Sequence, residues 1–459
     1  MAVNAVTNLN LGKALQIAYS EGIKQQLSTE FAEFDMIMQR RGKKTAARSY
    51  NFAVMTTLNP RSVGVLNVGT SNNPLPVGHQ PTMAEGSAVF KQYAATTTIE
   101  MDLWKRAMES PEKYFEPFAA SLESTQHSLK RRIAADVHQD GTGVLGTVAS
   151  TAVSGGMLVV TLSTSDTARG FVSWNERDDK VRVYDDTGVT SQAPTVSSGT
   201  FSYFVTYDVD RAAGTVTLQA FDSSDTALTV TAANAVGAGD LIYRFNQPSR
   251  PNLSATVTAD YGTLTDNMVG FEGLFGPIPG SSRIVHGLTY GSGVRVTNTS
   301  AGGASLDANS HLHACLDSLF INVGSSYQWS RAVASPEAIK TLIDSRETDR
   351  RFVSVDDKTR GASGFAYKHP TGGEVSLYAT EFCRKDRIWL LPEAKGDGKK
   401  VIEFLTTDFE PIDIGYGVNH LGHSTSANTH VSAIRQYMLG HGVLISNHPV
   451  AVGVIHAFV

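Results

Sequence analysis

Apolar residues recur at helical spacing near the start of the chain. The recurring positions are Leu11, Leu15, Ile23, Leu27, Phe31, Phe34 and Ile37. Residues spaced by three and four lie on one face of a helix. Asn10 can cap its start, and Arg40 and Arg41 would oppose the negative end of the helix dipole before Gly42 ends it. The pattern therefore predicts an amphipathic helix over residues 11–41.

Alternating apolar and polar positions follow on both sides of a turn-rich stretch. Residues 49–55 predict one strand, and residues 89–103 predict a longer one. The stretch between them, residues 57–86, is rich in proline, glycine and asparagine, which favour turns. Two strands around such a loop form a hairpin arm, which is too small to bury a core of its own. We therefore expect this arm to be stabilised by a neighbouring copy of the chain.

A long helix is predicted next. Ser110, Pro111 and Glu112 form a strong start signal, with a capping serine and a proline in the first turn. One apolar stripe follows, made of Phe118, Leu122, Leu129, Ile133 and Val137. Gly141 is expected to end the helix.

Residues 147–246 have a different pattern, dominated by threonine, serine, valine and alanine. Short alternating segments between turn signals predict a small all-β unit. The predicted strands include Met157–Leu162, Lys180–Tyr184, Phe201–Tyr207 and Thr215–Ala220. Mixed helix and strand patterns resume afterwards, so we interpret the unit as an insertion.

The remaining part of the chain predicts helices and strands together. The predicted elements are helices at 312–323 and 335–346 and strands at 374–378, 387–391, 441–445 and 450–458. The last two strands are expected to pair as a buried hairpin that turns at residues 447–449. Together these patterns predict an α+β protein.

Composition narrows the class of protein. The chain has 459 residues and a formal net charge of -5, and only 18% of its residues are charged, below the usual quarter. Its length predicts two or more domains. Two cysteines, Cys315 and Cys383, exclude a disulfide framework and favour a reducing cytoplasm. The chain starts without a signal-peptide pattern and has no apolar run long enough to span a membrane.

Motifs for enzyme chemistry give weak signals. Gly141, Gly143 and Gly146 match the spacing of a dinucleotide-binding loop, but that loop needs a strand before it and a helix after it. Here a helix precedes the glycines, so we interpret them as a helix stop. The sequence lacks a Walker-type phosphate loop, Gly-x-Ser-x-Gly and His-Glu-x-x-His. We therefore predict no catalytic residue, no cofactor and no enzyme activity.

Histidines and basic runs offer two further candidate sites. His311, His313 and Cys315 are close in sequence, but residues two apart on a helix point to different faces. We therefore expect a core cysteine with two solvated histidines, and no metal site. The later histidines match no standard ligand spacing; they are His420, His423, His430, His441, His448 and His456. The basic runs 130–132 and 40–44 predict solvated or subunit-contacting faces rather than a nucleic-acid site.

Five short sequence segments, taken together with their order along the chain, resemble major capsid proteins of tailed bacteriophages with the Hong Kong 97-type fold. They are Arg132 to Gly141, Phe271 to Leu274, Ala334 to Ile339, Gly372 to Leu377 and Asp386 to Pro392. The order of predicted elements resembles the same family. The resemblance implies an N-terminal arm and helix (1–47), an extended hairpin loop with its strands (48–104, tip about 56–92) and a spine helix region (105–146). It also implies a β-rich insertion domain (147–246) and an axial domain with the remaining peripheral strands (247–459).

The resemblance also implies a function. The chain would self-assemble into pentamers and hexamers of an icosahedral shell that encloses double-stranded DNA. Its partners would be copies of itself, a separate scaffolding protein and a portal, with decoration proteins left open. Contact with the packaged DNA would be non-specific. The shell would assemble in the bacterial cytoplasm and locate to the virion, without a membrane.

Two departures from the family give expectations of their own. Some relatives cross-link through a lysine in the extended loop, but this chain has no lysine between Lys44 and Lys91. We therefore expect no covalent ladder from mature particles on a denaturing gel. Some relatives lose a long N-terminal scaffolding segment, whereas the arm-like pattern here begins by Leu11. We expect no large N-terminal truncation in the mass of the shell protein.

Two other hypotheses remain open from the sequence. A carbohydrate-binding or host-attachment protein could use aromatic residues of the insert, which are Trp174, Tyr184, Tyr203 and Tyr207. At strand spacing, however, such residues more often belong to a core. An encapsulin-type compartment shell protein would share most of these features but would normally lack a β insertion of this size.

Overall fold

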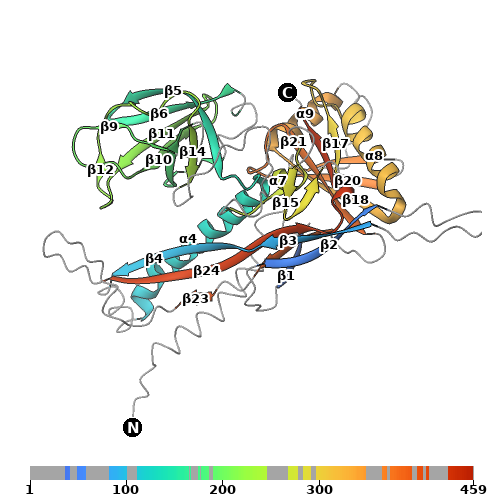
Figure 1. The fold of residues 1–459 in the computed structure, drawn as a ribbon, viewed down its shortest axis with the longest axis horizontal. Helices are drawn as coiled ribbons and strands as arrows, with labels where there is room; N and C mark the ends of the chain where they lie inside the picture. The colour runs from blue at the N-terminus through green and yellow to red at the C-terminus, as the bar shows by residue number, and fades with distance from the viewer. Residues whose placement is uncertain are drawn as a thin grey trace, which may run out of the picture.

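The computed structural model describes most of the chain in three groups of elements, each around its own hydrophobic core (Figure 1). The described residues are 37–41, 49–57, 82–100, 111–164, 166, 174–175, 177–185, 190–244, 267–277, 283–290, 296–347, 364–369, 373–394, 401–406, 410–412 and 433–457.

A long two-stranded ribbon and a long helix form the first group. Strand β4 (Lys91–Glu100) pairs antiparallel with β24 (Ala433–Ser446), from Lys91 opposite Gly442 to Glu100 opposite Ala433. Helix α4 (Pro111–His138) runs along this ribbon and packs on β4 (Figure 1). The sheet is completed by β22 (Ile402–Thr406), β23 (Glu410–Ile412) and β1 (Met38–Arg41).

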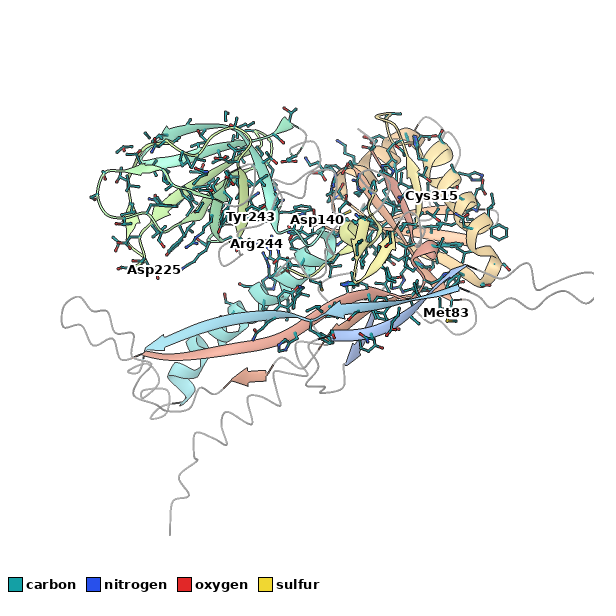
Figure 2. All side chains as sticks on the ribbon, viewed as in Figure 1. Met83, Asp140, Asp225, Tyr243, Arg244 and Cys315 are labelled. Carbon is teal, nitrogen blue, oxygen red and sulfur yellow. The ribbon has the colours of Figure 1, made fainter. Side chains whose placement is uncertain are left out.

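The hairpin of β2 (Ser49–Thr57) and β3 (Thr82–Val89) also belongs to the first core. Phe52, Val54 and Ala88 are buried there, whereas Ser49, Asn51 and Ala53 on the other face are exposed. This alternation is the period-two pattern that predicted the first strand. At the far end of β3, Met83 is 61% exposed (Figure 2).

The second group is a small closed barrel (Figure 1). Six strands pair in the ring order β10-β11-β6-β5-β14-β7, and β10 pairs back to β7. They are β5 (Val144–Ser154), β6 (Met157–Leu162), β7 (Lys180–Tyr184), β10 (Tyr203–Asp210), β11 (Thr215–Phe221) and β14 (Leu241–Arg244). Short strands flank the ring: β8 (Ser191–Gln192), β9 (Thr195–Val196), β12 (Ala227–Leu228) and β13 (Val230–Ala232). Closure leaves the six strands without an open edge, and inward-facing valines and leucines fill the barrel.

The third group is a six-stranded mixed sheet with helices, in the order β17-β25-β21-β18-β20-β19. Its strands are β17 (Thr297–Ser300), β18 (Tyr327–Ala334), β19 (Gly364–His369), β20 (Gly373–Ala379), β21 (Arg387–Ala394) and β25 (Gly453–His456). The helical segments are η3 (Ala308–Leu312), α8 (His313–Val323), η4 (Gly324–Ser326), α9 (Pro336–Glu347) and η7 (Pro449–Ala451).

Both faces of this sheet are buried. Ile388 and Leu390 of β21 pack with α8 and α9, whereas Trp389 and Leu391 face the first core. Successive side chains of a strand point to opposite faces, so one strand contributes to two cores. This explains the continuously apolar sequence of β21, which is typical of a strand covered on both sides.

Short elements connect the groups. Helix α7 (Phe271–Phe275) is wholly buried beside the end of α4, and β15 (Arg283–Val285) pairs with β16 (Leu288–Tyr290). Among the helices in the described part of the chain, none is both long enough and apolar enough to cross a membrane.

The structure corrects three predictions about secondary structure and strand pairing. Residues 38–41, expected to end a helix, form β1 and pair in parallel with residues 403–406 of β22; residues 1–36 of the predicted helix lie outside the described residues. The last two predicted strands do not form a hairpin, because β24 pairs with β4, β22 and β23, and β25 pairs with β17 and β21. The return from the hairpin tip begins at Thr82, earlier than the predicted limit near residue 92.

The prediction that the hairpin arm depends on other copies is wrong for its base. Phe52 and Val54 are buried in the chain's own first core, and the backbone N–H of Ser87 donates to the carbonyl oxygen of His286 at 2.8 Å. The paired part of the hairpin, from Ser49 opposite Val89 to Thr57 opposite Thr82, therefore packs on the chain's own core. The tip, residues 58–81, lies outside the described residues.

Candidate functional site

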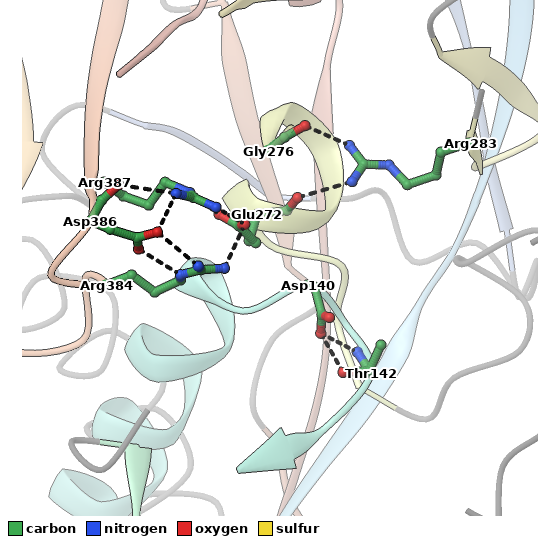
Figure 3. Close-up of polar contacts among 8 residues, drawn as sticks. All are labelled: Asp140, Thr142, Glu272, Gly276, Arg283, Arg384, Asp386 and Arg387. Atoms are coloured by element: carbon green, nitrogen blue, oxygen red, sulfur yellow. Dashed lines mark hydrogen bonds and ion pairs between the residues drawn. The ribbon is translucent and has the colours of Figure 1, made fainter. Parts of the chain in front are cut away.

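Buried polar contacts fix the three groups of elements to one another, and the most extensive of them surrounds Glu272 on α7 (Figure 3). Arg387 donates two hydrogen bonds to this carboxylate, from Nε to Oε2 at 3.0 Å and from Nη2 to Oε1 at 2.9 Å. Arg384 donates a third, from Nη1 to Oε1 at 2.7 Å. Asp386 accepts from both arginines, so two carboxylates balance two guanidinium groups.

The Glu272 cluster is held in its charged form. Burial raises the pKa of Glu272, but the attraction of Arg384 and Arg387 outweighs it and lowers that pKa to about 2. Arg283 adds hydrogen bonds to the carbonyl oxygens of Glu272 and Gly276, at the C-terminal end of α7. The paired charges of Glu272, Arg384, Asp386 and Arg387 clamp α7 to the turn before β21.

A second joint surrounds Asp136, near the end of α4. Tyr93 of β4 donates its hydroxyl to Oδ2 at 3.1 Å, and Arg132 approaches Oδ1 at 3.3 Å. Arg244 of β14 lies 3.6 Å from the same oxygen and 3.0 Å from Oδ2 of Asp179. Burial raises the pKa of Asp136 despite Arg132. The ribbon, the long helix and the barrel therefore meet at one carboxyl group.

The barrel is joined to the body where its chain enters and leaves. The Asp140 side chain accepts hydrogen bonds from N and Oγ1 of Thr142, at 2.7 and 2.5 Å, and shapes the turn out of α4 (Figure 3). Leu241 pairs with Thr147 and Tyr243 with Val144, so the first and last strands of the barrel lie side by side. Trp174 Nε1 donates to the carbonyl oxygen of Phe382 at 2.9 Å. These contacts orient the barrel on the body.

The glycine motif has the structural role that its context predicted. Gly141 and Gly143 follow α4 with φ of 85° and 75°, a conformation that favours glycine, and β5 follows them. A side chain at Gly141 would also contact the backbone of Val269. The motif is a helix stop that leads into the barrel, and the helix that a phosphate-binding loop requires after it is replaced by a strand.

The sequence-predicted histidine and cysteine candidates separate in space. Cys315 is buried, and burial raises the pKa of its thiol to about 12; both cysteines are free. His311 accepts a hydrogen bond from the backbone N–H of Asp307. His313 instead lies next to Asp317 and His369, a grouping that the sequence did not predict because His369 is 56 residues away.

The later histidines do not form one cluster in the described part of the chain. His448 stacks on Tyr327, and burial lowers the pKa of both His448 and His456. His441 lies on β24. The predicted positions 420, 423 and 430 lie outside the described residues.

The basic run at residues 130–132, predicted as a solvated or subunit-contacting face, is only partly exposed. Lys130 is buried, Arg131 pairs with Glu381 at 3.1 Å, and Arg132 pairs with Asp136. The side chains of Arg131 and Arg132 are 32% and 23% exposed, so both arginines combine a partner within the chain with some contact to solvent. The run at residues 40–44 is described only as the strand backbone of Arg40 and Arg41.

The aromatic residues of the barrel are mostly core residues. Trp174, Tyr184 and Tyr203 are each 5% exposed or less, and Tyr207 is 59% exposed. Three of the four candidate rings are therefore used in packing and are not available to stack on a sugar. The carbohydrate-binding hypothesis therefore gains no support from them.

Comparisons with known proteins give matches in structure only. The chain matches no family model and no curated protein sequence. Among solved structures, it is similar to a subunit of the cyanophage A-1(L) capsid asymmetric unit, with a TM-score of 0.45 and 8% identity, covering 92% of this chain and 90% of that one.

Two further capsids align over similar lengths. The capsid of the native GTA particle gives a TM-score of 0.40 and 9% identity over 93% of this chain and 89% of that one. The satellite phage P4 procapsid, which includes the size determination protein Sid, gives a TM-score of 0.37 and 6% identity over 100% of this chain and 98% of that one. These identities and TM-scores are low, so the matches indicate a distant similarity in structure alone.

Proposed function

We propose that this chain is the major capsid protein of a tailed bacteriophage, with a Hong Kong 97-like α+β fold. The observation that carries the proposal is the pairing of β4 with β24 along α4, next to a hairpin that leads to a 24-residue excursion at residues 58–81. A ribbon beside a long helix, next to a hairpin whose two strands are separated by a long segment of sequence, is the arrangement expected of a subunit that extends across its neighbours.

Strand edges without a partner in the described part of the chain support contacts between copies. Within the described strands, β4 pairs on one side only, with β24, and β2 pairs only with β3. A strand edge can accept another strand through main-chain hydrogen bonds. In a closed shell, each subunit would use such edges and its hairpin tip to contact neighbours, and many modest contacts would sum to a stable lattice.

We assign the parts of the subunit accordingly. Residues 1–47 form the N-terminal arm, 48–104 the extended loop and its strands, and 105–146 the spine helix region. Residues 147–246 form the inserted β domain, whose adjacent first and last strands are typical of an insertion. Residues 247–459 supply the axial domain, built around the six-stranded sheet, and the remaining peripheral strands.

The proposed assembly is an icosahedral shell of pentamers and hexamers around double-stranded DNA. Its partners are other copies of the chain, a scaffolding protein and the portal. Assembly takes place in the bacterial cytoplasm, and the product is the virion shell. The net charge of -5 fits an inner shell surface that binds DNA only weakly.

The hairpin tip offers a direct test. Thr57 and Thr82 are paired across the hairpin, so residues 58–81 can be replaced by Asn-Gly without moving the base. We expect this variant to unfold at the same denaturant midpoint as the wild-type chain, since the base packs on its own core. Sedimentation velocity should show that the wild-type chain forms large closed particles and the variant does not.

The control keeps the length of the tip and changes its sequence little. A variant with Ser71→Ala, in the middle of residues 58–81, should assemble like the wild-type chain. Assembly of the shortened hairpin to wild-type particles would show that the tip does not hold the shell together, and the proposed role of the loop would be wrong.

A further inference from the structure

One cluster of side chains, away from the buried joints around Glu272 and Asp136, consists of residue types that bind metal ions. His313 and Asp317 lie one turn apart on α8, so they share a face of that helix. His369 is the last residue of β19, the edge strand of the six-stranded sheet. One ligand atom from each of these three residues lies within 4.8 Å of the other two.

The distances match the spacing of ligands around a metal ion. Asp317 Oδ2 lies 3.3 Å from His313 Nε2, and Asp317 Oδ1 lies 3.3 Å from His369 Nε2. Around a tetrahedral zinc ion with bonds of about 2.1 Å, neighbouring ligand atoms are separated by about 3.4 Å.

Neighbouring groups orient the cluster as metal sites require. Tyr367 lies two residues before His369 and therefore on the same face of β19, and its hydroxyl lies 3.1 Å from His313 Nδ1. With Nε2 on a metal, Nδ1 carries the hydrogen and donates it to the Tyr367 oxygen, a contact that fixes the ring. The buried His369 ring is anchored beside it, with 4.4 Å between the two histidine ring centroids.

The exposure of the cluster also suits a metal ion. The side chains of His313 and Asp317 are 40% and 48% exposed, so an ion can enter from solvent and keep an open coordination position.

We propose that His313, Asp317 and His369 form a binding site for one divalent transition-metal ion, with zinc the best fit. Two imidazoles and one carboxylate are a ligand set typical of such ions. The site would tie α8 to the edge strand β19, because two of its ligands lie on the helix and the third on the strand. The bound ion would therefore stabilise this lobe of the chain.

The test titrates ions into the full chain. Untagged protein is freed of metal with EDTA, the chelator is removed, and ZnCl₂ is added in a calorimeter. We expect one ion per chain with micromolar affinity or tighter. CoCl₂ added in place of zinc should produce visible absorption bands of a bound, low-coordinate cobalt ion. Asp317→Asn and His313→Gln should each weaken zinc binding tenfold or more, and Tyr367→Phe about tenfold.

His127→Gln is the matched control, because His127 is an exposed histidine on α4, away from α8 and β19. It should leave zinc affinity unchanged. Denaturant unfolding midpoints measured in EDTA show whether each variant is folded. If Asp317→Asn does not fold, His313→Gln alone serves as the test variant. Absence of saturable binding, or wild-type affinity in both variants, would overturn the proposal. Binding is measured on the unassembled chain, so a failure to form shells would leave this result standing.

Discussion

At the scale of single residues, the buried carboxylate of Glu272 is matched by two buried arginines. Glu272 is paired with Arg384 and Arg387, and Asp386 balances the second positive charge. Breaking a buried ion pair on one side costs more than the pair contributes, because the remaining charge stays buried without compensation. The stability of the junction between α7 and β21 therefore depends on each member of the set.

Replacing Glu272 with glutamine should destabilise the chain strongly. We expect a loss of about 3 kcal/mol in the free energy of unfolding, since two buried arginines lose their shared carboxylate. Chemical denaturation followed by circular dichroism measures it. Glu337→Gln is the control, because the Glu337 side chain is 58% exposed in its pair with Lys385. This substitution should lower the free energy of unfolding by about 0.5 kcal/mol or less. Equal effects of the two substitutions would contradict this account.

The same carboxylate predicts a dependence on pH. The pKa of Glu272 is about 2 in the folded chain, against an ordinary value of 4.5 for a glutamate without neighbours. A depressed folded pKa stabilises the fold above the unfolded value, and that contribution is lost as pH falls from about 4.5 towards about 2. The stability difference between wild type and Glu272→Gln should therefore shrink over this range. A difference that is the same at neutral pH and at about pH 3 would contradict the assignment.

At the scale of elements, close backbone contacts hold the end of α4 against α7. A side chain at Gly270 would fall on the carbonyl oxygens of Asp136 and Val137, and Gly270 itself donates its N–H to the carbonyl oxygen of Gln139 at 3.1 Å. The absence of a side chain at this position lets the two elements approach so closely.

Gly270→Ala should therefore separate α7 from α4 and destabilise the chain by about 2 kcal/mol or more. Gly237→Ala is the matched control, since a Cβ there would meet nothing within 4 Å and its stability should change little. Thermal unfolding of both variants compares them. A tolerated substitution at Gly270 would show that the contact is not as tight as described.

The barrel should be removable as a unit. Its first and last strands pair at Val144 and Tyr243, so residues 144–244 can be replaced by a short glycine-serine linker. We expect the remaining chain to unfold cooperatively, because the other two cores contain no barrel residue among those that the structure describes. Loss of the Arg244 contact with Asp136 should lower the midpoint moderately. A chain that is insoluble or lacks a cooperative transition would contradict the assignment of an inserted domain.

Local periodicity predicted many elements well. Strands β6 and β7 have the predicted bounds, α4 begins at the predicted proline, and α9 begins one residue after its predicted start. Ser335, just before α9, accepts a capping hydrogen bond from the N–H of Ala338. These elements follow from spacing and capping within a few residues of sequence. Residues 38–41 became a strand instead because β22, which lies far along the chain, offers them a partner.

The candidate sites were harder to predict. Glu272 and Arg387 are 115 residues apart, and His313 and His369 meet only through the order of strands in the sheet. Neither grouping can be predicted from the spacing of residues along a short stretch of sequence. The sequence did predict that Cys315 and its neighbouring histidines do not form one site, because side chains two residues apart on a helix point to different faces.

At the scale of the whole molecule, three cores are linked through a few buried joints. The ribbon of β4 and β24, the barrel and the six-stranded lobe meet around α4, where Asp136 contacts both Tyr93 and Arg244. Such a framework can carry a long loop and exposed strand edges without unfolding. It suits a subunit whose neighbours differ slightly in position around a shell.

The most direct test of the central claim is electron microscopy of the expressed chain. The full-length protein is produced in bacteria, alone and together with a scaffolding protein, and imaged by negative stain. We predict closed particles of uniform size built from rings of subunits. A monodisperse small oligomer under both conditions would contradict the proposal that this chain builds a capsid.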